Sequence, residues 1–167
     1  VAREGGGWAN EHLNQHGDFC GGEMMELGHA ANVHKPILHQ FDRHGRRIDE
    51  VEFHPAYHEL MRRLMQNQVH NFSWVHQGKP GATVVRAALG YMSGQADAGT
   101  GCPLSMTFSA VPAMRHDPAL AQVWESRLMS SVYDPRTLPA EQKNGCTMGM
   151  GMTDKQGGSD VRSTTTR

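Results

Sequence analysis

The strongest constraint on the fold is the spacing of apolar residues between positions 54 and 128, where they recur three and four residues apart. This spacing places apolar side chains on one face of a helix and predicts a packed helical domain. The clearest helix opens at His54-Pro55, because proline is tolerated in a first helical turn. Its apolar face consists of Tyr57, Leu60, Met61, Leu64 and Met65.

Three further helices are expected after this one. A strongly apolar helix over 82–98 should lie in the middle of the domain, and Pro103 should start the next helix. Pro112 falls inside that helix and should bend it or end it early. Asp117-Pro118 combines a capping residue with a first-turn proline, which predicts a final helix.

The N-terminal part has a different pattern. Two short helices are expected over 8–16 and 22–33, separated by glycines. Residues 37–53 then place an Asp-x-x-Gly turn at Asp42 to Gly45 between two segments that carry apolar residues. This arrangement indicates either a small hairpin or an extended excursion.

The C-terminal part changes character again. Residues 131–145 look irregular, whereas residues 148–167 read as a short strand, a glycine-rich corner and a second strand. We therefore predict a helical domain over 1–145 and the truncated start of a β-domain over 146–167, a mainly α fold that is α+β overall. Because the sequence starts at Val1 and ends inside the expected strand, we expect it to be a piece of a longer protein.

Composition narrows the function classes. The 167 residues carry 16 basic and 17 acidic side chains, a near balance that argues against a dedicated nucleic-acid surface in this segment. No apolar run is long enough to span a bilayer, and no secretory signal is visible at the start. The three cysteines are far apart with no CxxC, which suggests reduced thiols in a cytosolic protein.

The glycine-rich corner is the best candidate for chemistry. Glycines let backbone amides approach a ligand closely, and the hydroxyls of Thr153 and Ser159 flank the corner. These groups suit a phosphate-bearing or flavin-like cofactor. On spacing alone, a tight turn that joins two strands is the favoured interpretation, because glycine-rich corners are common. Met148, Met150 and Met152 alternate, and they would either line a cofactor pocket or pack against the helices.

Other candidate sites are weaker. His54 and His58 have a zinc-like spacing but no evident third ligand, so we expect no metal and place His54 at a helix start. A nucleophilic triad around Cys102 is not supported. A basic turn could contact phosphate or a neighbouring subunit, or be a solvated loop, and the acidic residues that follow cancel its charge. This turn contains Arg43, His44, Arg46 and Arg47.

The run from Gly151 to Asp160 resembles the first signature of the acyl-CoA dehydrogenase family, in which a helical N-terminal domain leads into a central β-domain through T-E-x-x-x-G-S-D. Four phrases are closer still to the AidB-like adaptive-response branch, and the resemblance covers essentially the whole chain. These phrases are 45–58, 101–107, 133–135 and 149–153. Asp154 stands where the family has glutamate, so the loop should relax if that carboxylate positions it.

The resemblance implies a flavin site in the corner. Ser159 would lie near the FAD pyrophosphate and also near the bound acyl-CoA thioester. The implied reaction is α,β-dehydrogenation of that thioester with hydride transfer to the flavin. The general base belongs to a C-terminal domain beyond this sequence, so no catalytic residue is expected here and the segment alone should be inactive. The implied FAD-binding residues are Met150, Gly151, Met152, Thr153, Asp154, Lys155, Gln156, Gly157, Gly158 and Ser159.

Two rival functions remain open. The AidB-like branch is associated with the response to DNA alkylation, so the resemblance also implies a protein that binds and protects DNA through its C-terminal part, with weak or vestigial dehydrogenation. The plainest alternative is a helical interaction domain whose terminal turn binds nothing. By resemblance, we also expect a homotetramer. The cysteine pattern and the lack of a long apolar run predict a cytoplasmic protein that does not contact membranes.

Overall fold

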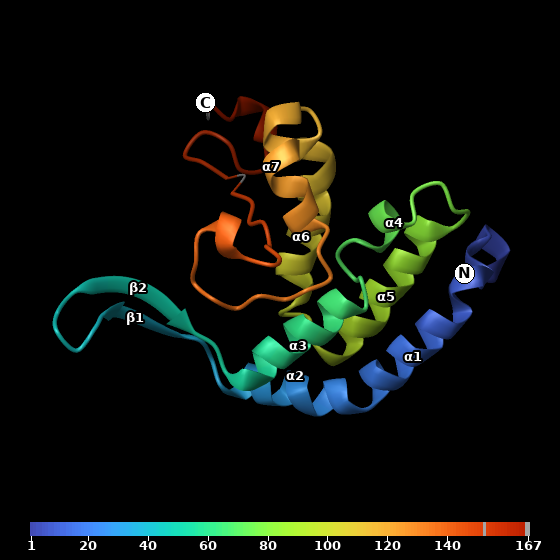
Figure 1. The fold of residues 1–167 in the computed structure, drawn as a ribbon, viewed down its shortest axis with the longest axis horizontal. Coiled ribbons are helices and arrows are strands. Elements are labelled where there is room, and N and C mark those ends of the chain that lie inside the picture. Colours follow the sequence, from blue (N-terminus) through green and yellow to red (C-terminus); the bar gives the residue numbers. More distant parts are fainter. Residues whose placement is uncertain (152, 166–167) are drawn as a thin grey trace.

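The computed structural model describes residues 1–151 and 153–165, and helices dominate it (Figure 1). Most of the expected helices form close to their predicted bounds, and a two-stranded hairpin interrupts them. The longer elements are α1 (Asn10–Gly21), α2 (Glu23–Val33), β1 (Ile37–Phe41), β2 (Arg47–Glu52), α3 (Pro55–Gln66), α4 (Phe72–Val75), α5 (Ala82–Ala96), α6 (Gly101–Met114) and α7 (Pro118–Leu128). Short 3₁₀ turns lie at Ala2–Glu4, Gly6–Ala9, Ala140–Gln142 and Val161–Ser163.

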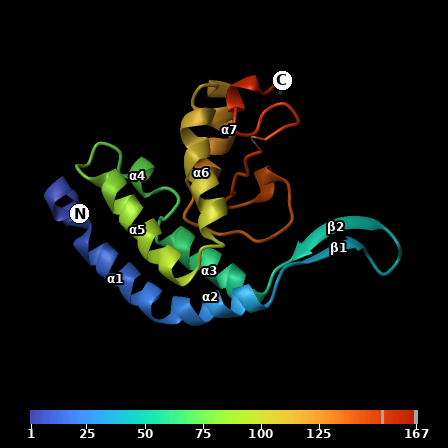
Figure 2. The ribbon, with the colours of Figure 1, turned by 180° about the vertical axis from the view of Figure 1, so that it is seen from behind.

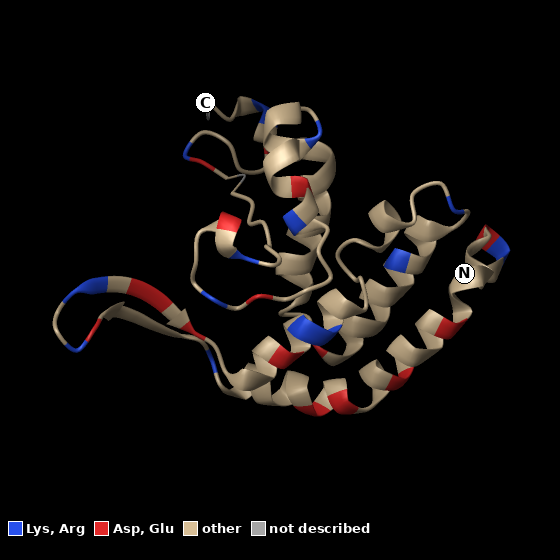
Figure 3. Cartoon of the chain, in the orientation of Figure 1, with Lys and Arg blue, Asp and Glu red and all other residues tan. Residues whose placement is uncertain are grey.

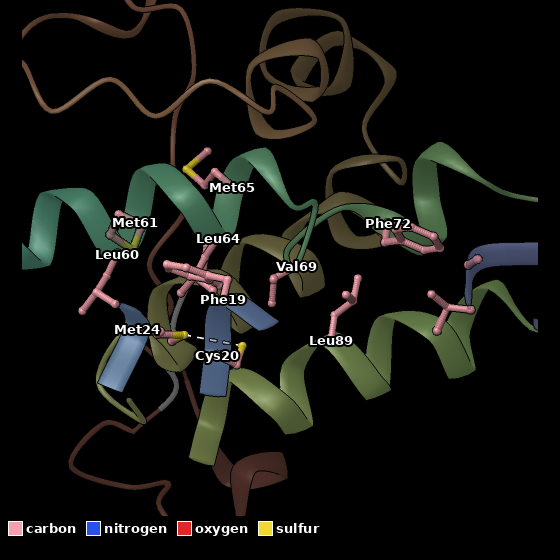
Figure 4. Packing of buried hydrophobic residues seen from close by; sticks show 13 residues of the cluster. Phe19, Cys20, Met24, Leu60, Met61, Leu64, Met65, Val69, Phe72 and Leu89 are labelled. Carbon is pink, nitrogen blue, oxygen red and sulfur yellow. Dashed lines mark hydrogen bonds between the residues drawn. The ribbon is translucent and has the colours of Figure 1, made fainter. Parts of the chain in front are cut away.

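Helix α3 contributes the centre of the main core. Pro55 occupies its first turn, and the ring Nδ1 of His54 accepts a hydrogen bond from the Ala56 amide at 3.2 Å. His54 is therefore a helix cap, as the sequence suggested. The apolar face of α3 packs on α2, while α5 packs on α1 (Figure 4). The largest buried side chains of this core include Met24, Leu60, Met61, Leu64, Met65, Phe72 and Leu89.

Helix α5 packs against α1, α2, α4 and α6, which agrees with its predicted place in the middle of the domain. Only one of its faces is buried, through Val85, Leu89 and Ser93. Tyr91 lies on the opposite side and is 71% exposed. A helix with several neighbours can therefore still expose one of its faces.

Helix α6 differs from the prediction. It starts at Gly101, two residues before Pro103, and it continues past Pro112 to Met114. Proline lacks the amide that would bond the carbonyl four residues back, which here is that of Phe108. The indole Nε1 of Trp74 donates to this carbonyl at 3.0 Å instead. A distant side chain thus replaces the missing helical bond, so the helix does not end early.

Segment 37–53 forms the hairpin rather than an extended excursion. β1 and β2 pair antiparallel, and Leu38 lies opposite Val51. The Asp42 carboxylate closes the turn by accepting the amides of His44 and Arg46 at 2.8 and 2.9 Å. Seen from either side, the hairpin projects away from the helices (Figures 1 and 2).

Helices α6 and α7 build a second, smaller core. Ala110, Val111, Leu128 and Cys146 are its buried members. The Asp117 carboxylate caps α7 by accepting two backbone amides, which confirms the capping signal. This unit is tied to the main core by buried polar side chains of the 66–72 connection. The ring Nε2 of His70 lies 3.0 Å from the Ser130 carbonyl, and the Asn71 amide donates to Met129.

The strands predicted at the C-terminal end do not form within residues 146–151 and 153–165. Those residues are irregular apart from the 3₁₀ turn Val161–Ser163. A strand needs a neighbouring strand to bond, and the amides of Cys146 and Met148 bond instead to the Arg127 carbonyl and the Thr107 hydroxyl. The division at residue 145 stays a prediction.

Two absences concern the described residues only. None of the helices they form has both the length and the apolar character needed to cross a membrane. Within the same residues, no group of three or more His, Cys, Asp or Glu side chains is arranged to hold a metal ion.

Leu64 tests the main core because its side chain is fully buried. We expect Leu64→Ala to lower the free energy of unfolding by about 2–5 kcal/mol, since it removes apolar contacts and leaves a cavity. Leu120→Ala is the matched control, because Leu120 is 47% exposed, and it should change stability by less than about 0.5 kcal/mol. Urea denaturation of both variants checks this, and equal losses would contradict the assignment of the core.

His70 predicts an acid-sensitive connection between the two cores. Burial lowers the pKa of His70 from 6.5 to about 4, because the charged ring is poorly solvated there. As the pH falls from 6.5 to 4, His70 therefore becomes protonated in the unfolded chain while it stays neutral in the folded chain. The His70 contribution is complete above pH 6.5 and falls by roughly 3 kcal/mol by pH 4.

The measurement is the free energy of unfolding against pH for the original protein and for His70→Gln. Glutamine keeps a donor but does not titrate in this range. The variant should lose less stability than the original protein between pH 6.5 and 4. Parallel pH curves would contradict a neutral buried His70.

Candidate functional site

The glycine-rich corner closes around the carboxylate of Asp154. Its Oδ1 accepts the backbone amides of Gln156 at 3.0 Å and Gly157 at 2.5 Å, and its Oδ2 accepts the Thr165 amide at 3.3 Å. The Asp154 amide donates to the Gly157 carbonyl at 2.9 Å. An aspartate side chain is short enough to bond amides two and three residues ahead. Asp154 therefore does position the loop, and both of its carboxylate oxygens accept backbone amides despite the shorter side chain.

Position 157 accepts only glycine, because Thr164 lies too close for any side chain there. A Cβ placed on Gly157 would lie 2.2 Å from the Thr164 hydroxyl oxygen and 3.1 Å from the Thr164 amide. This is closer than atoms can approach, so a larger residue would push the two sides of the corner apart. By contrast, a Cβ on Gly149 or Gly151 would meet no atom within 4 Å. The backbone at these two glycines is therefore bare and open to a ligand.

The structure brings the described members of the predicted FAD-binding set into one corner beside α6 and α7 (Figure 1). Gly157 is buried and Asp154 is half-buried. The predicted site residue Met152 lies outside the described residues. The others have exposed side chains or backbone in this chain, so the corner offers its hydroxyls to solvent instead of enclosing them. These exposed members are Met150, Gly151, Thr153, Lys155, Gln156, Gly158 and Ser159.

Helix α6 positions the segment that leads into the corner. The Thr107 hydroxyl is buried, donates to the Pro103 carbonyl at 2.7 Å and accepts the Met148 amide at 3.0 Å. The Met150 amide lies 3.3 Å from the sulfur of Met106. Met148 also packs against the second core, whereas Met150 is 49% exposed. Of the alternating methionines, Met148 thus packs against the helices, whereas Met150 faces solvent.

A cleft of about 380 Å³ lies between the hairpin, α3 and the loop that precedes the corner. His58 and Tyr133 meet across it, with the ring Nδ1 2.9 Å from the phenol oxygen, and burial raises the pKa of Tyr133. On the same wall, Asp134 binds the Arg136 guanidinium and the Asn144 amide. These partners hold the pKa of Asp134 well below its usual range.

The sequence did not predict this cleft, because residues 133–135 indicated only the family resemblance and not their position beside α3. The Asp-Pro dipeptide is a turn signal, but it does not reveal that the turn returns to α3. The two histidines with zinc-like spacing have different partners in the structure. His54 stacks on His34 with ring centres 4.5 Å apart, and His58 turns to Tyr133. The three cysteines are free, and Cys102 is exposed.

Comparison with known families decides the relationship. The family model described as "Adaptive response protein AidB N-terminal domain" matches residues 1–135. The chain belongs to this family. Over its full length it is 48% identical to the putative acyl-CoA dehydrogenase AidB of Escherichia coli K12, and it spans 31% of that relative. It is 26% identical over 89% of its length to acyl-CoA dehydrogenase family member 11 of Caenorhabditis elegans, of which it spans 24%.

Solved structures show the same fold. The apo form of Bd2924 superposes with a TM-score of 0.81 over 96% of this chain, at 25% identity and covering 30% of the larger protein. Caenorhabditis elegans ACDH-11 in complex with C11-CoA gives a TM-score of 0.75 over 90% of this chain, at 25% identity and 25% coverage. The AidB N-terminal domain described here is thus the mostly helical N-terminal part of an acyl-CoA dehydrogenase-like fold.

Asp154 is testable as the residue that holds the corner. In Asp154→Ala the amides of Gln156 and Gly157 lose their acceptor, so their hydrogen exchange should accelerate by roughly tenfold. The control is Asp160→Ala, because the Asp160 carboxylate accepts the Arg162 amide instead. Exchange measured by NMR checks both variants. Unchanged exchange at the two amides in Asp154→Ala would contradict this role.

Proposed function

We propose that this chain supplies one wall of an FAD site in a flavoprotein of the acyl-CoA dehydrogenase type. The observation that carries the proposal is the Asp154-centred corner, in which Thr153 and Ser159 are exposed while Gly157 is locked. Relatives named as acyl-CoA dehydrogenases support the proposal. The enzyme class that follows is an oxidoreductase acting on CH–CH bonds.

The residues present fit such a group. The bare backbone at Gly149 and Gly151 allows a flat ring to approach without meeting a side chain. The Thr153 hydroxyl beside it would donate a hydrogen bond to the ring edge, and Ser159 would bond the pyrophosphate. When bound, FAD accepts the hydride from the substrate β-carbon. The chain's own contribution is to bind and orient the reactants.

The proposed substrate is an acyl-CoA thioester. Support comes from the ACDH-11 relative, which is solved in complex with C11-CoA. Ser159 is exposed and would contact the thioester as well as the cofactor. The general base is proposed to lie in the part of the longer relatives that this chain does not span, so the 167 residues alone should not turn over substrate.

The cellular setting belongs to the same proposal. Exposed Cys102 and buried Cys20 and Cys146 are all free thiols, which is usual in a reducing compartment and supports a cytoplasmic location. A homotetramer is the proposed assembly.

A second candidate is a DNA-protective role in the response to alkylation. The description of the matching family as an adaptive-response protein favours it. Lysine and arginine are spread over several elements of the chain, while helices α1 and α2 carry acidic residues without lysine or arginine (Figure 3). DNA contact is therefore proposed for another part of the protein. A steep fall of duplex affinity with salt would support this role, and no binding at low salt would remove it.

The flavin proposal is tested by removing the two hydroxyls in the full-length protein that carries these residues. Thr153→Val with Ser159→Ala should weaken FAD binding by roughly tenfold or more, because two hydrogen bonds are lost. Titration of the flavin-free protein, followed by the flavin absorbance, measures this.

The matched control is Thr83→Val with Ser109→Ala, which removes the same groups from exposed positions on α5 and α6. The control should bind FAD as tightly as the original protein. If the original protein binds no FAD, or if both double variants bind it equally well, the assignment of the corner is wrong.

A further inference from the structure

The hairpin joins the helices through two short connections, and a histidine stands at each of them. We call residues 37–52, with strands β1 and β2, the arm, which projects beyond the helices in both views (Figures 1 and 2). His34 directly follows α2, and His54 directly precedes α3. Their rings stack with centres 4.5 Å apart and planes 14° apart. This stacked pair, which we call the root, therefore ties the two ends of the arm together.

His54 also caps α3, and this cap is incompatible with a proton on the capping nitrogen. The ring Nδ1 of His54 accepts the Ala56 amide at 3.2 Å, so that nitrogen must keep its lone pair. A protonated imidazole carries a hydrogen on both ring nitrogens and accepts no hydrogen bond. A positive charge on His54 would also lie at the positive end of α3, which repels it.

The second ring of the root adds to this effect. His34 lies parallel to His54, so two protonated rings would place two positive charges about a ring thickness apart. Like charges at that distance repel, although solvent and salt reduce the repulsion at a partly exposed site. Acid therefore acts on the cap and on the stack at the same time, and it weakens both.

The charged groups that face the root do not cancel this effect. The root lines a hollow of about 370 Å³ together with Lys35, Asp97 and Tyr57. Lys35 repels a charged root. Burial raises the pKa of the Tyr57 phenol, which is therefore neutral. Asp97 attracts a charged root, but its two carboxylate oxygens already accept hydrogen bonds from Asn32 and Thr100.

Two further ionisable side chains lie close to His54 in the chain, and both have other partners. Glu52 binds the ring of His39 at 2.6 Å within the arm. The ring of His58 bonds the Tyr133 phenol across the cleft. The response of the root to acid thus depends on its own two rings, with Lys35 and Asp97 as the charged groups beside them.

The remaining attachment of the arm does not titrate. Phe53 stacks on Tyr57 with ring centres 4.2 Å apart, and it lines both the hollow at the root and the cleft of about 380 Å³. The pairing of β1 with β2 involves neither root histidine. The arm therefore keeps its own structure when the root opens, and Phe53 is the point about which it would turn.

We propose that the root is a pH-sensitive hinge, which holds the arm near neutral pH and releases it in acid. A proton from solvent binds Nδ1 of His54, the hydrogen bond from the Ala56 amide breaks, and the ring leaves the helix end. Imidazole side chains take up protons between pH 5 and 8, so this is the range of the switch. Because the open root binds more protons than the closed root, a falling pH favours opening. The arm is one wall of the cleft, so its release widens the cleft.

Hydrogen exchange of the full-length protein, followed by mass spectrometry, tests the hinge. Peptides over 53–59 report the amides of Ala56 and Tyr57 once the intrinsic effect of pH on exchange is corrected. Their opening equilibrium should rise about fivefold to tenfold between pH 7.5 and 5.5, because a helix cap is lost and protons are taken up. Peptides over 60–66 should keep their protection. This difference separates local opening from the acid effect of His70.

Three histidine variants identify the group responsible. His54→Asn keeps an oxygen that accepts the Ala56 amide but does not titrate, so peptides over 53–59 should respond to acid less than about twofold. His34→Gln keeps the titratable cap and removes the second charge, so its response should lie between the other two. The matched control is His116→Asn, which removes an exposed histidine from the connection between α6 and α7 and should respond as the original protein does.

Spin labels measure the movement of the arm itself. They are placed at Gln40→Cys on the arm and at Thr137→Cys on the loop across the cleft, with Cys102→Ser to remove the exposed thiol. Excess unlabelled protein restricts the measured pairs to one chain. The label distance should lengthen or broaden at pH 5.5, and it should stay constant when His54→Asn is added.

The proposal is overturned if peptides over 53–59 in the original protein do not respond to acid. It is equally overturned if His54→Asn responds as strongly as the original protein, because another group would then be the switch. A root that opens while the label distance stays the same would show that the arm is held elsewhere, and the hinge would be refuted.

Discussion

The Asp154 carboxylate is the contact on which the candidate site depends. It holds the amides of Gln156 and Gly157, and this fixes the corner while Thr153 and Ser159 stay exposed. Preorganised donors bind a ligand with less loss of entropy than donors on a mobile loop.

The helices matter to function because they deliver the corner. Thr107 on α6 binds the Met148 amide, and α6 itself persists past Pro112 because Trp74 caps the Phe108 carbonyl. A side chain from α4, far away in the sequence, therefore supports the helix on which the corner segment lies. The position of the corner therefore depends on α6, and α6 in turn depends on its contact with Trp74.

The sequence predicted the elements whose causes are local. Apolar spacing located α3, and Asp117-Pro118 located the start of α7. It could not predict features that depend on distant partners. Proline in a helix bends it or ends it, and the sequence does not show that Trp74 supplies a donor for the Phe108 carbonyl that Pro112 leaves unbonded. The C-terminal strands were expected from alternating residues, but a strand forms only beside another strand. Nor did the family pattern reveal which amides Asp154 accepts.

Hydrogen exchange of the full-length protein, with and without FAD, tests the central claim most directly. If the corner holds the flavin, adding FAD to the flavin-free protein will slow exchange in residues 148–160, while residues 37–52 of the arm remain unchanged. Exchange in 148–160 that stays the same at saturating FAD would contradict the account, whatever the protein does elsewhere.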